Sequence, residues 1–157
     1  MQTFAGTFVI YLLVAVAGLF WSAGAHAADN SALTSPVKSV YDHYLKIQSA
    51  LAGDSLAGVA ENAKAIAKAA QGDAKTLSAD VGTQAEALAK AKDLKSARAA
   101  FKPLSDALIK YLADHNAKDA YVEIYCPMAH ASWLQAGKKV NNPYLGKSMS
   151  ECGEIQN

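Results

Sequence analysis

Apolar side chains recur at three- and four-residue steps between residues 37 and 112, and this spacing constrains the fold more than any other feature of the chain. The steps match the 3.6-residue turn of an α-helix, so each run places its apolar residues on one side of a helix. Many intervening positions are alanine, which has the highest helix propensity and allows helix axes to approach closely. The pattern predicts an all-α fold, a small up-and-down bundle of about four helices.

The first two helices are bounded by residues typical of helix ends. Ser35-Pro36 has the form of an N-cap followed by proline in the first turn, and Gly53 is expected to end that helix. Asp54 is expected to cap the second helix directly afterwards, and Gly72 to end it. The positions of the first helix predicted to face the core are Val37, Val40, Tyr41, Tyr44, Ile47 and Leu51.

Two further helices are predicted. The capping-box pattern Thr83-Gln84-Ala85-Glu86 predicts the start of a shorter third helix. Asp93 can cap a fourth, which continues to about residue 112. Pro103 lies inside that fourth pattern, lacks an N–H and crowds the carbonyl four residues back, so it predicts either a kink or two abutting helices.

The pattern changes after Asn116. Residues 121–125 are β-branched and aromatic with alternating polarity, which predicts a short extended segment. Three glycines and two prolines lie between Cys126 and Gly153, so this part is expected to be loop, with at most one helical turn around residues 132–135. We call residues 121–157 the tail and predict that it is loop-rich and packs on the bundle.

The chain opens with an apolar run, residues 4–21, that contains no Asp, Glu, Lys or Arg. Ala25-His26-Ala27 then has the small-x-small form that signal peptidase recognises, which predicts a signal peptide over residues 1–27 and a single exported, periplasmic domain over residues 28–157. Residues 1–7 lack Lys and Arg, so a second interpretation stays open, in which the segment is kept as a membrane anchor. Membrane contact is expected only in that case.

Charge and motif content narrow the class of function. All fifteen Lys/Arg and fourteen Asp/Glu residues come after residue 28, so the exported domain would be nearly neutral, which argues against nucleic acid as a partner. The chain has no Cys-x-x-Cys-His, His-Glu-x-x-His, Gly-rich phosphate loop or Gly-x-Ser-x-Gly motif. We therefore expect a protein that is not an enzyme.

Soft metal ligands are concentrated in the tail. Cys126, Met128 and His130 are spaced by two, so in an extended segment their side chains share a face. Met149 and Cys152 are three apart and can converge on one side of a turn. Two thiols, two thioethers and one imidazole suit Cu(I) or Ag(I) better than zinc or magnesium, so these five residues are the predicted metal ligands, with His130 as an auxiliary.

An alternative needs no metal. Cys126 and Cys152 can form a disulfide, as two cysteines in an exported protein commonly do, and the bridge would hold the tail on the bundle. Met128 and Met149 would then be ordinary core residues. The two interpretations are compatible if the pair changes between bridge and thiolate ligands, and the sequence leaves both open.

These residues also carry a resemblance. The chain resembles a family of bacterial periplasmic domains of unknown function, found alone and at the C-terminal end of adaptor subunits of copper- and silver-exporting (RND-type) efflux pumps. The matching stretches are Ala97-Arg98, Phe101, Leu104-Ser105, Leu108, Cys126-Pro127-Met128-Ala129, Trp133-Leu134, Asn142-Pro143-Tyr144, Gly146, Met149 and Cys152-Gly153-Glu154. The connection His130-Ala131-Ser132 is shorter than the family's glycine-bearing insertion, which makes His130 a feature of this sequence. The resemblance implies a helical bundle associated with heavy-metal handling.

Two functions are consistent with these observations. The first is a heavy-metal-binding protein of the periplasm that buffers Cu(I) or Ag(I), or delivers the ion to a periplasmic efflux adaptor or another envelope protein. The second is a non-catalytic structural or protein-interaction module whose bundle docks another envelope protein and whose cysteines only fix the tail.

Overall fold

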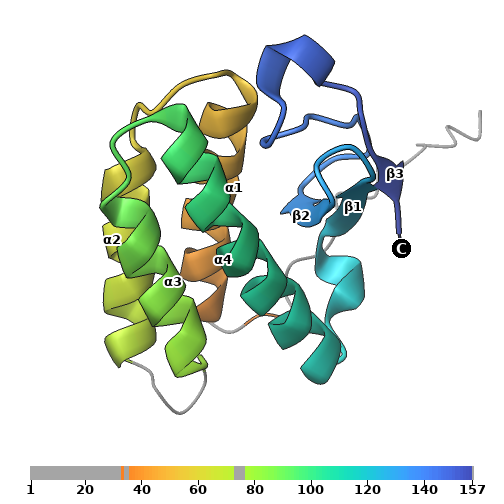
Figure 1. Ribbon diagram of the computed structural model, residues 1–157. Helices are drawn as coiled ribbons and strands as arrows, with labels where there is room; N and C mark the ends of the chain where they lie inside the picture. The colour runs from red at the N-terminus through yellow and green to blue at the C-terminus, as the bar shows by residue number, and fades with distance from the viewer. Residues whose placement is uncertain (1–32, 34–35, 73–76, 157) are drawn as a thin grey trace, which may run out of the picture.

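A computed structural model describes residues 33, 36–72 and 77–156 of the chain. Four helices are followed by short strands and 3-10 turns (Figure 1). The helices are α1 (Val37–Ala52), α2 (Val59–Gly72), α3 (Ala79–Ala89) and α4 (Leu94–Asp114). The predicted bundle of four helices is confirmed. The predicted signal peptide and Ser35 lie outside the described residues, and within the described part no helix is long and apolar enough to cross a membrane.

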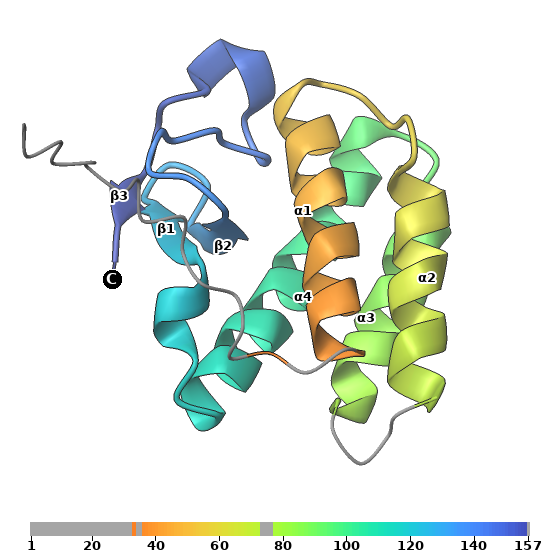
Figure 2. The ribbon, with the colours of Figure 1, turned by 180° about the vertical axis from the view of Figure 1, so that it is seen from behind.

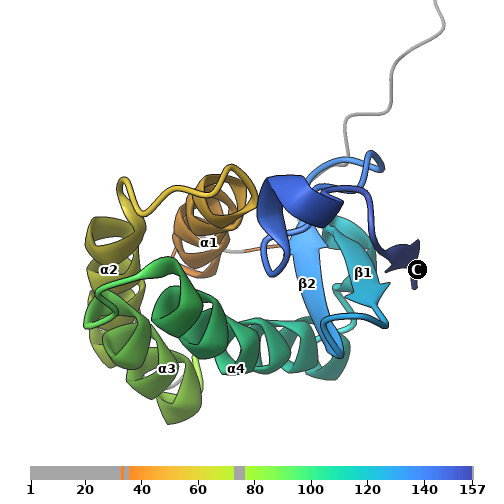
Figure 3. The same ribbon diagram turned by 45° about the horizontal axis from the view of Figure 1, so that its top comes forward.

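The predicted core positions of α1 are all buried, as the helical spacing requires. The backbones of consecutive helices lie close together, whereas α1 and α4 lie farther apart and meet through long side chains such as Tyr44 and Phe101, whose rings stack. The strand β2 lies across both of them, on the side opposite α2 and α3 (Figures 1, 2 and 3). The bundle is therefore closed on one side by the tail.

Two helix-start predictions fail and one succeeds. The Asp93 side chain accepts a hydrogen bond from the Ser96 N–H at 2.7 Å and forms a capping box, as predicted for α4. Thr83 does not begin α3, which starts four residues earlier, and its hydroxyl donates to the Ala79 carbonyl inside the helix. Asp54 does not cap α2, because α2 begins only at Val59 and Asp54 has a φ of 57°. Pro103 lies within the single helix α4, so the prediction of two abutting helices is wrong.

The tail corrects the all-α prediction. It forms a three-stranded antiparallel sheet in the order β2-β1-β3. Its elements are β1 (Val122–Cys126), β2 (Ala131–Gln135), the 3-10 turn η3 (Gly146–Met149) and β3 (Glu154–Ile155), and the turn η2 (Lys118–Ala120) precedes them. The extended segment expected at residues 121–125 is confirmed as β1. The helical turn expected at residues 132–135 is wrong, because those residues pair with β1 and bury Trp133 completely.

A buried polar network joins the tail to the bundle. The Tyr44 hydroxyl lies 2.7 Å from Ser105 Oγ and accepts a hydrogen bond from the Leu134 N–H at 3.1 Å. The Tyr144 hydroxyl donates to the Ser132 carbonyl at 2.7 Å, and its oxygen lies 3.2 Å from Ser105 Oγ, which can donate to it. Burial raises the pKa of both tyrosines, so they remain neutral donors. Because an unpaired buried polar group is costly, this network fixes β2 against α1 and α4.

Candidate functional site

The two cysteines lie together beside the sheet. Cys126 ends β1, and Cys152 directly precedes Gly153 and β3, which pairs with β1. Their Sγ atoms are 2.6 Å apart, and both are free cysteines. The structure therefore brings the predicted pair together as two thiols, and it contains no disulfide between them.

The two thiols have different surroundings and different pKa values. Cys126 is fully buried, which raises its pKa, but hydrogen bonds from Cys152, from the backbone N–H groups of Ala129 and Met128 and from Asn142 outweigh burial and lower it. Cys152 is only half-buried, and its pKa is raised, first by the hydrogen bond with Cys126 and then by burial. Cys126 is thus the first of the two to become a thiolate.

The predicted methionine ligands lie at the surface. Met128 is 65% exposed, in the turn between β1 and β2, and Met149 is 42% exposed, at the end of η3. The backbone of each contacts the cysteines: the Met128 N–H faces both sulfur atoms, and the Met149 carbonyl accepts from the Cys152 N–H at 3.1 Å. The interpretation of these methionines as core residues is wrong.

The shared face predicted for Cys126, Met128 and His130 does not form. Residues 127–130 make the turn of the β1–β2 hairpin, so the extended alternation ends at Cys126. His130 is exposed and has a φ of 48°. Among the described residues no group of three or more His, Cys, Asp or Glu side chains could hold a metal ion. A soft-metal site here would therefore need a thioether of Met128 or Met149 to join the two thiols.

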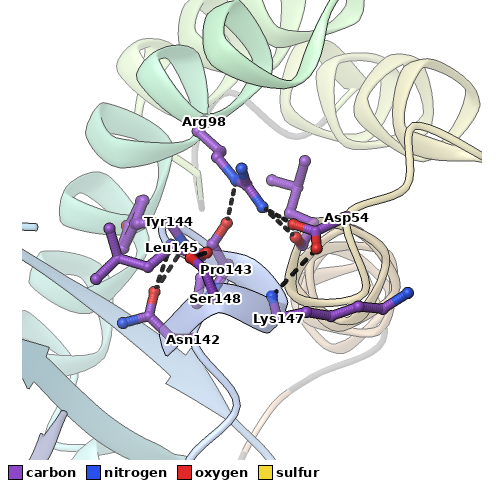
Figure 4. Close-up of polar contacts among 9 residues, drawn as sticks. Asp54, Arg98, Asn142, Pro143, Tyr144, Leu145, Lys147 and Ser148 are labelled. Atoms are coloured by element: carbon purple, nitrogen blue, oxygen red, sulfur yellow. Dashed lines mark hydrogen bonds and ion pairs between the residues drawn. The ribbon is translucent and has the colours of Figure 1, made fainter. Parts of the chain in front are cut away.

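Asn142 connects the cysteines to the rest of the tail. It is fully buried, and its Nδ2 donates to the Cys152 carbonyl at 2.7 Å. Its Oδ1 accepts from the N–H groups of Tyr144 and Leu145 at 2.8 and 2.9 Å, and its own N–H donates to the Ser150 carbonyl. Figure 4 shows the contacts with Tyr144 and Leu145. Together with the contacts to Ser150 and Cys152, one residue thus fixes the segments on both sides of η3.

An ion-paired arginine and aspartate of the bundle hold the tail through hydrogen bonds to its backbone (Figure 4). Arg98 of α4 donates from Nη2 to Asp54 at 2.5 Å and to the Leu51 carbonyl at 3.0 Å, and from Nε to the Pro143 carbonyl at 2.9 Å. The Lys147 N–H donates to the other Asp54 oxygen at 3.2 Å. We call Asp54, Arg98, Pro143 and Lys147 the clasp. Sequence reasoning missed it, although Arg98 and Asn142-Pro143-Tyr144 belong to the motifs that carried the resemblance.

The comparisons with known proteins agree with the bundle. The family described as "Protein of unknown function (DUF3347)" matches residues 40–120, just over half of the chain. The chain belongs to the DUF3347 family. The resemblance is confirmed at this level, as membership of a domain family of unknown function. The match ends before β1, so both cysteines of this DUF3347 protein lie outside it. No curated protein and no solved structure matches the chain.

Elsewhere, the DUF3347 bundle carries two hollows between α2 and α3, each of about 290 Å³. Figure 3 shows α2 and α3, whose residues line both hollows, on the side of the bundle away from the sheet. Lys64, Lys68 and Lys90 line the first, and a hydrogen bond between Gln71 and Glu86 borders both. Because exposed amines of this kind are ordinary solvated groups, we assign no chemistry to these hollows.

The clasp requires glycine at position 146. Gly146 has a φ of 59°, and a Cβ there would overlap Asp54 and Arg98. Gly146→Ala should therefore lower the free energy of unfolding by about 2 kcal/mol or more, measured by urea denaturation. Gly137→Ala is the matched control, because its added Cβ would meet no atom within 4 Å. Equal effects of the two substitutions would contradict this role of Gly146.

The Asp54–Arg98 pair should make stability depend on pH. The hydrogen bond from Arg98, followed by that from the Lys147 N–H, lowers the pKa of Asp54 in the folded state. A lowered carboxyl pKa contributes stability fully above its ordinary value of about 4, and this contribution is lost as the pH falls through the folded pKa. Asp54→Asn should therefore destabilise the protein at about pH 7, and the difference from wild type should shrink towards about pH 3.

Urea denaturation across this pH range measures the effect, and an Arg98→Gln background provides the control. Without the guanidinium, Asp54→Asn should lose most of its pH-dependent effect, because the group that lowers the carboxyl pKa is gone. If the effect of Asp54→Asn depended on pH equally in the wild-type and Arg98→Gln backgrounds, a group other than Arg98 would be responsible for the pH dependence.

Proposed function

We propose that this protein binds a soft monovalent metal ion, Cu(I) or Ag(I), at Cys126 and Cys152 with help from Met128 and Met149. It would act as an exported, non-enzymatic protein that buffers the ion or passes it to an efflux adaptor or another envelope protein. His130 would be at most an auxiliary ligand. The observation that carries the proposal is the pair of adjacent free thiols, which the backbone groups of two exposed methionines contact.

The chemistry of the thiols supports a metal ion as the ligand. Metal binding requires deprotonated sulfur, and the hydrogen bonds around Cys126 favour its thiolate. Polarizable thiolate and thioether sulfur selects Cu(I) over hard cations such as magnesium and calcium, which prefer oxygen ligands.

Binding would require the cysteines to separate. A zinc–thiolate bond is about 2.3 Å long, and with bonds of that length two sulfurs at a tetrahedral angle on one ion stand about 3.8 Å apart. The thiols are 2.6 Å apart, so one cysteine must move by about 1 Å. Cys152 lies in the short connection between η3 and β3 and is the less buried of the two, which makes it the one that can move.

The exposure of the methionines supports exchange with a partner. Thioethers that are already in solvent can take an ion from the thiolates without opening the core. Delivery to an efflux component would then proceed by stepwise replacement of sulfur ligands. Export itself rests on the sequence of residues 1–27.

A Cu(I) titration of the purified protein, in competition with a chelator of known affinity, tests the proposal. Reduced wild type should bind Cu(I), and Met128→Leu/Met149→Leu should weaken binding by at least about 10-fold, because leucine keeps the apolar volume without the sulfur. His115→Ala removes an imidazole remote from the site and is the control.

The opposite result would favour the second function. Binding by the double leucine variant as tight as that of wild type would remove the methionines from the site. If neither the reduced nor the oxidised protein binds Cu(I) more tightly than a Cys126→Ser/Cys152→Ser/Met128→Leu/Met149→Leu variant, the metal proposal fails. The domain would then be a structural or interaction module, for which the tail and its clasp provide the fixed surface.

A further inference from the structure

Solvent reaches the two cysteines unequally. Cys126 is completely buried, and the β1–β2 turn covers it so that the Ala129 N–H donates to its Sγ at 3.4 Å. Cys152 is half-buried and lies in the connection between η3 and β3. A reagent approaching the pair from solvent therefore meets Cys152 first.

The distance between the sulfurs determines how the pair behaves once one thiol has reacted. The Sγ atoms are 2.6 Å apart, so the Cys126 sulfur lies within reach of the Cys152 sulfur when Cys152 is in a mixed disulfide. Groups held this close react as if at very high concentration, so a second, intramolecular step should be much faster than the first.

We propose that Cys126 and Cys152 form an ordered dithiol pair that exchanges with an external disulfide, in which Cys152 reacts first and Cys126 resolves the product. Cys126 ionises more readily but is buried, so the reaction begins at the small thiolate fraction of the accessible Cys152. That thiolate attacks one sulfur of the external disulfide, forms a mixed disulfide and releases the other half as a thiolate. The Cys126 thiolate then attacks the Cys152 sulfur, forms the internal disulfide and releases the second half. Two electrons pass from the protein to the external disulfide, and the two protons of the protein thiols end on the released thiols.

This ordered exchange would regulate the proposed metal site, and in that respect it rests on the proposed function. The internal disulfide removes both thiolate ligands, which leaves only thioethers and lowers the affinity for a soft cation. The redox state of the surrounding thiols would thereby decide whether the protein holds its ion.

The order can be tested without metal, by treating reduced protein with glutathione disulfide and measuring the products by mass spectrometry. Cys126→Ser should accumulate one glutathione adduct at Cys152. Cys152→Ser should react at least about 10-fold more slowly, since Cys126 is exposed only on local opening. Wild type should end as the internal disulfide without an accumulated adduct.

Wild type provides a check that does not depend on how either serine variant folds. A brief pulse of iodoacetamide should label Cys152 before Cys126, as read from peptide masses. Equal labelling of the two, equal rates of the two variants, or a stable mixed disulfide on wild type would overturn the order. Because no metal is used, failure here is distinguishable from failure of the Cu(I) titration.

Discussion

Arg98 makes the interactions on which the position of the tail depends. One guanidinium donates to Asp54, to the Leu51 carbonyl near the end of α1 and to the carbonyl of Pro143, so it joins α4, the α1–α2 connection and the tail. Guanidinium suits this role because it is always charged and presents several donors in a fixed plane. The ion pair itself is partly exposed and contributes little by charge alone, so the importance of Arg98 lies in the carbonyl groups that it brings together.

Asn142 links the clasp to the cysteines. Its neighbour Pro143 is held by Arg98, while its side chain holds the Cys152 carbonyl and contributes to the low pKa of Cys126. The buried hydroxyls of Tyr44 and Tyr144 fix the other side of the hairpin. The geometry of the two thiols is thus set by contacts between segments far apart in the sequence. In this way the bundle positions a pair of thiols that lies outside its own helices.

The sequence predicts those parts of the molecule that local spacing determines. The buried stripe of α1 and the cap at Asp93 depend on residues within a turn or two, and both are confirmed. The strand at residues 131–135 depends on pairing with β1, and Asp54 depends on an arginine 44 positions away, so neither could be found locally. The cysteines could be singled out by side-chain type, but their unequal burial and the exposure of both methionines are set only by the fold.

The central claim is that the clasp holds the cysteine pair in place, and the alkylation rate of Cys126 tests it most directly. In a Cys152→Ser background, Cys126 is the only thiol left, so the measured alkylation rate is that of Cys126. Arg98→Gln should raise the rate by at least about 10-fold, because the tail then opens locally more often. Ile66→Val, which weakens the core on the far side of the bundle by about 1 kcal/mol, should change the rate far less. A rate that Arg98→Gln leaves unchanged, or that both substitutions raise equally, would contradict the account.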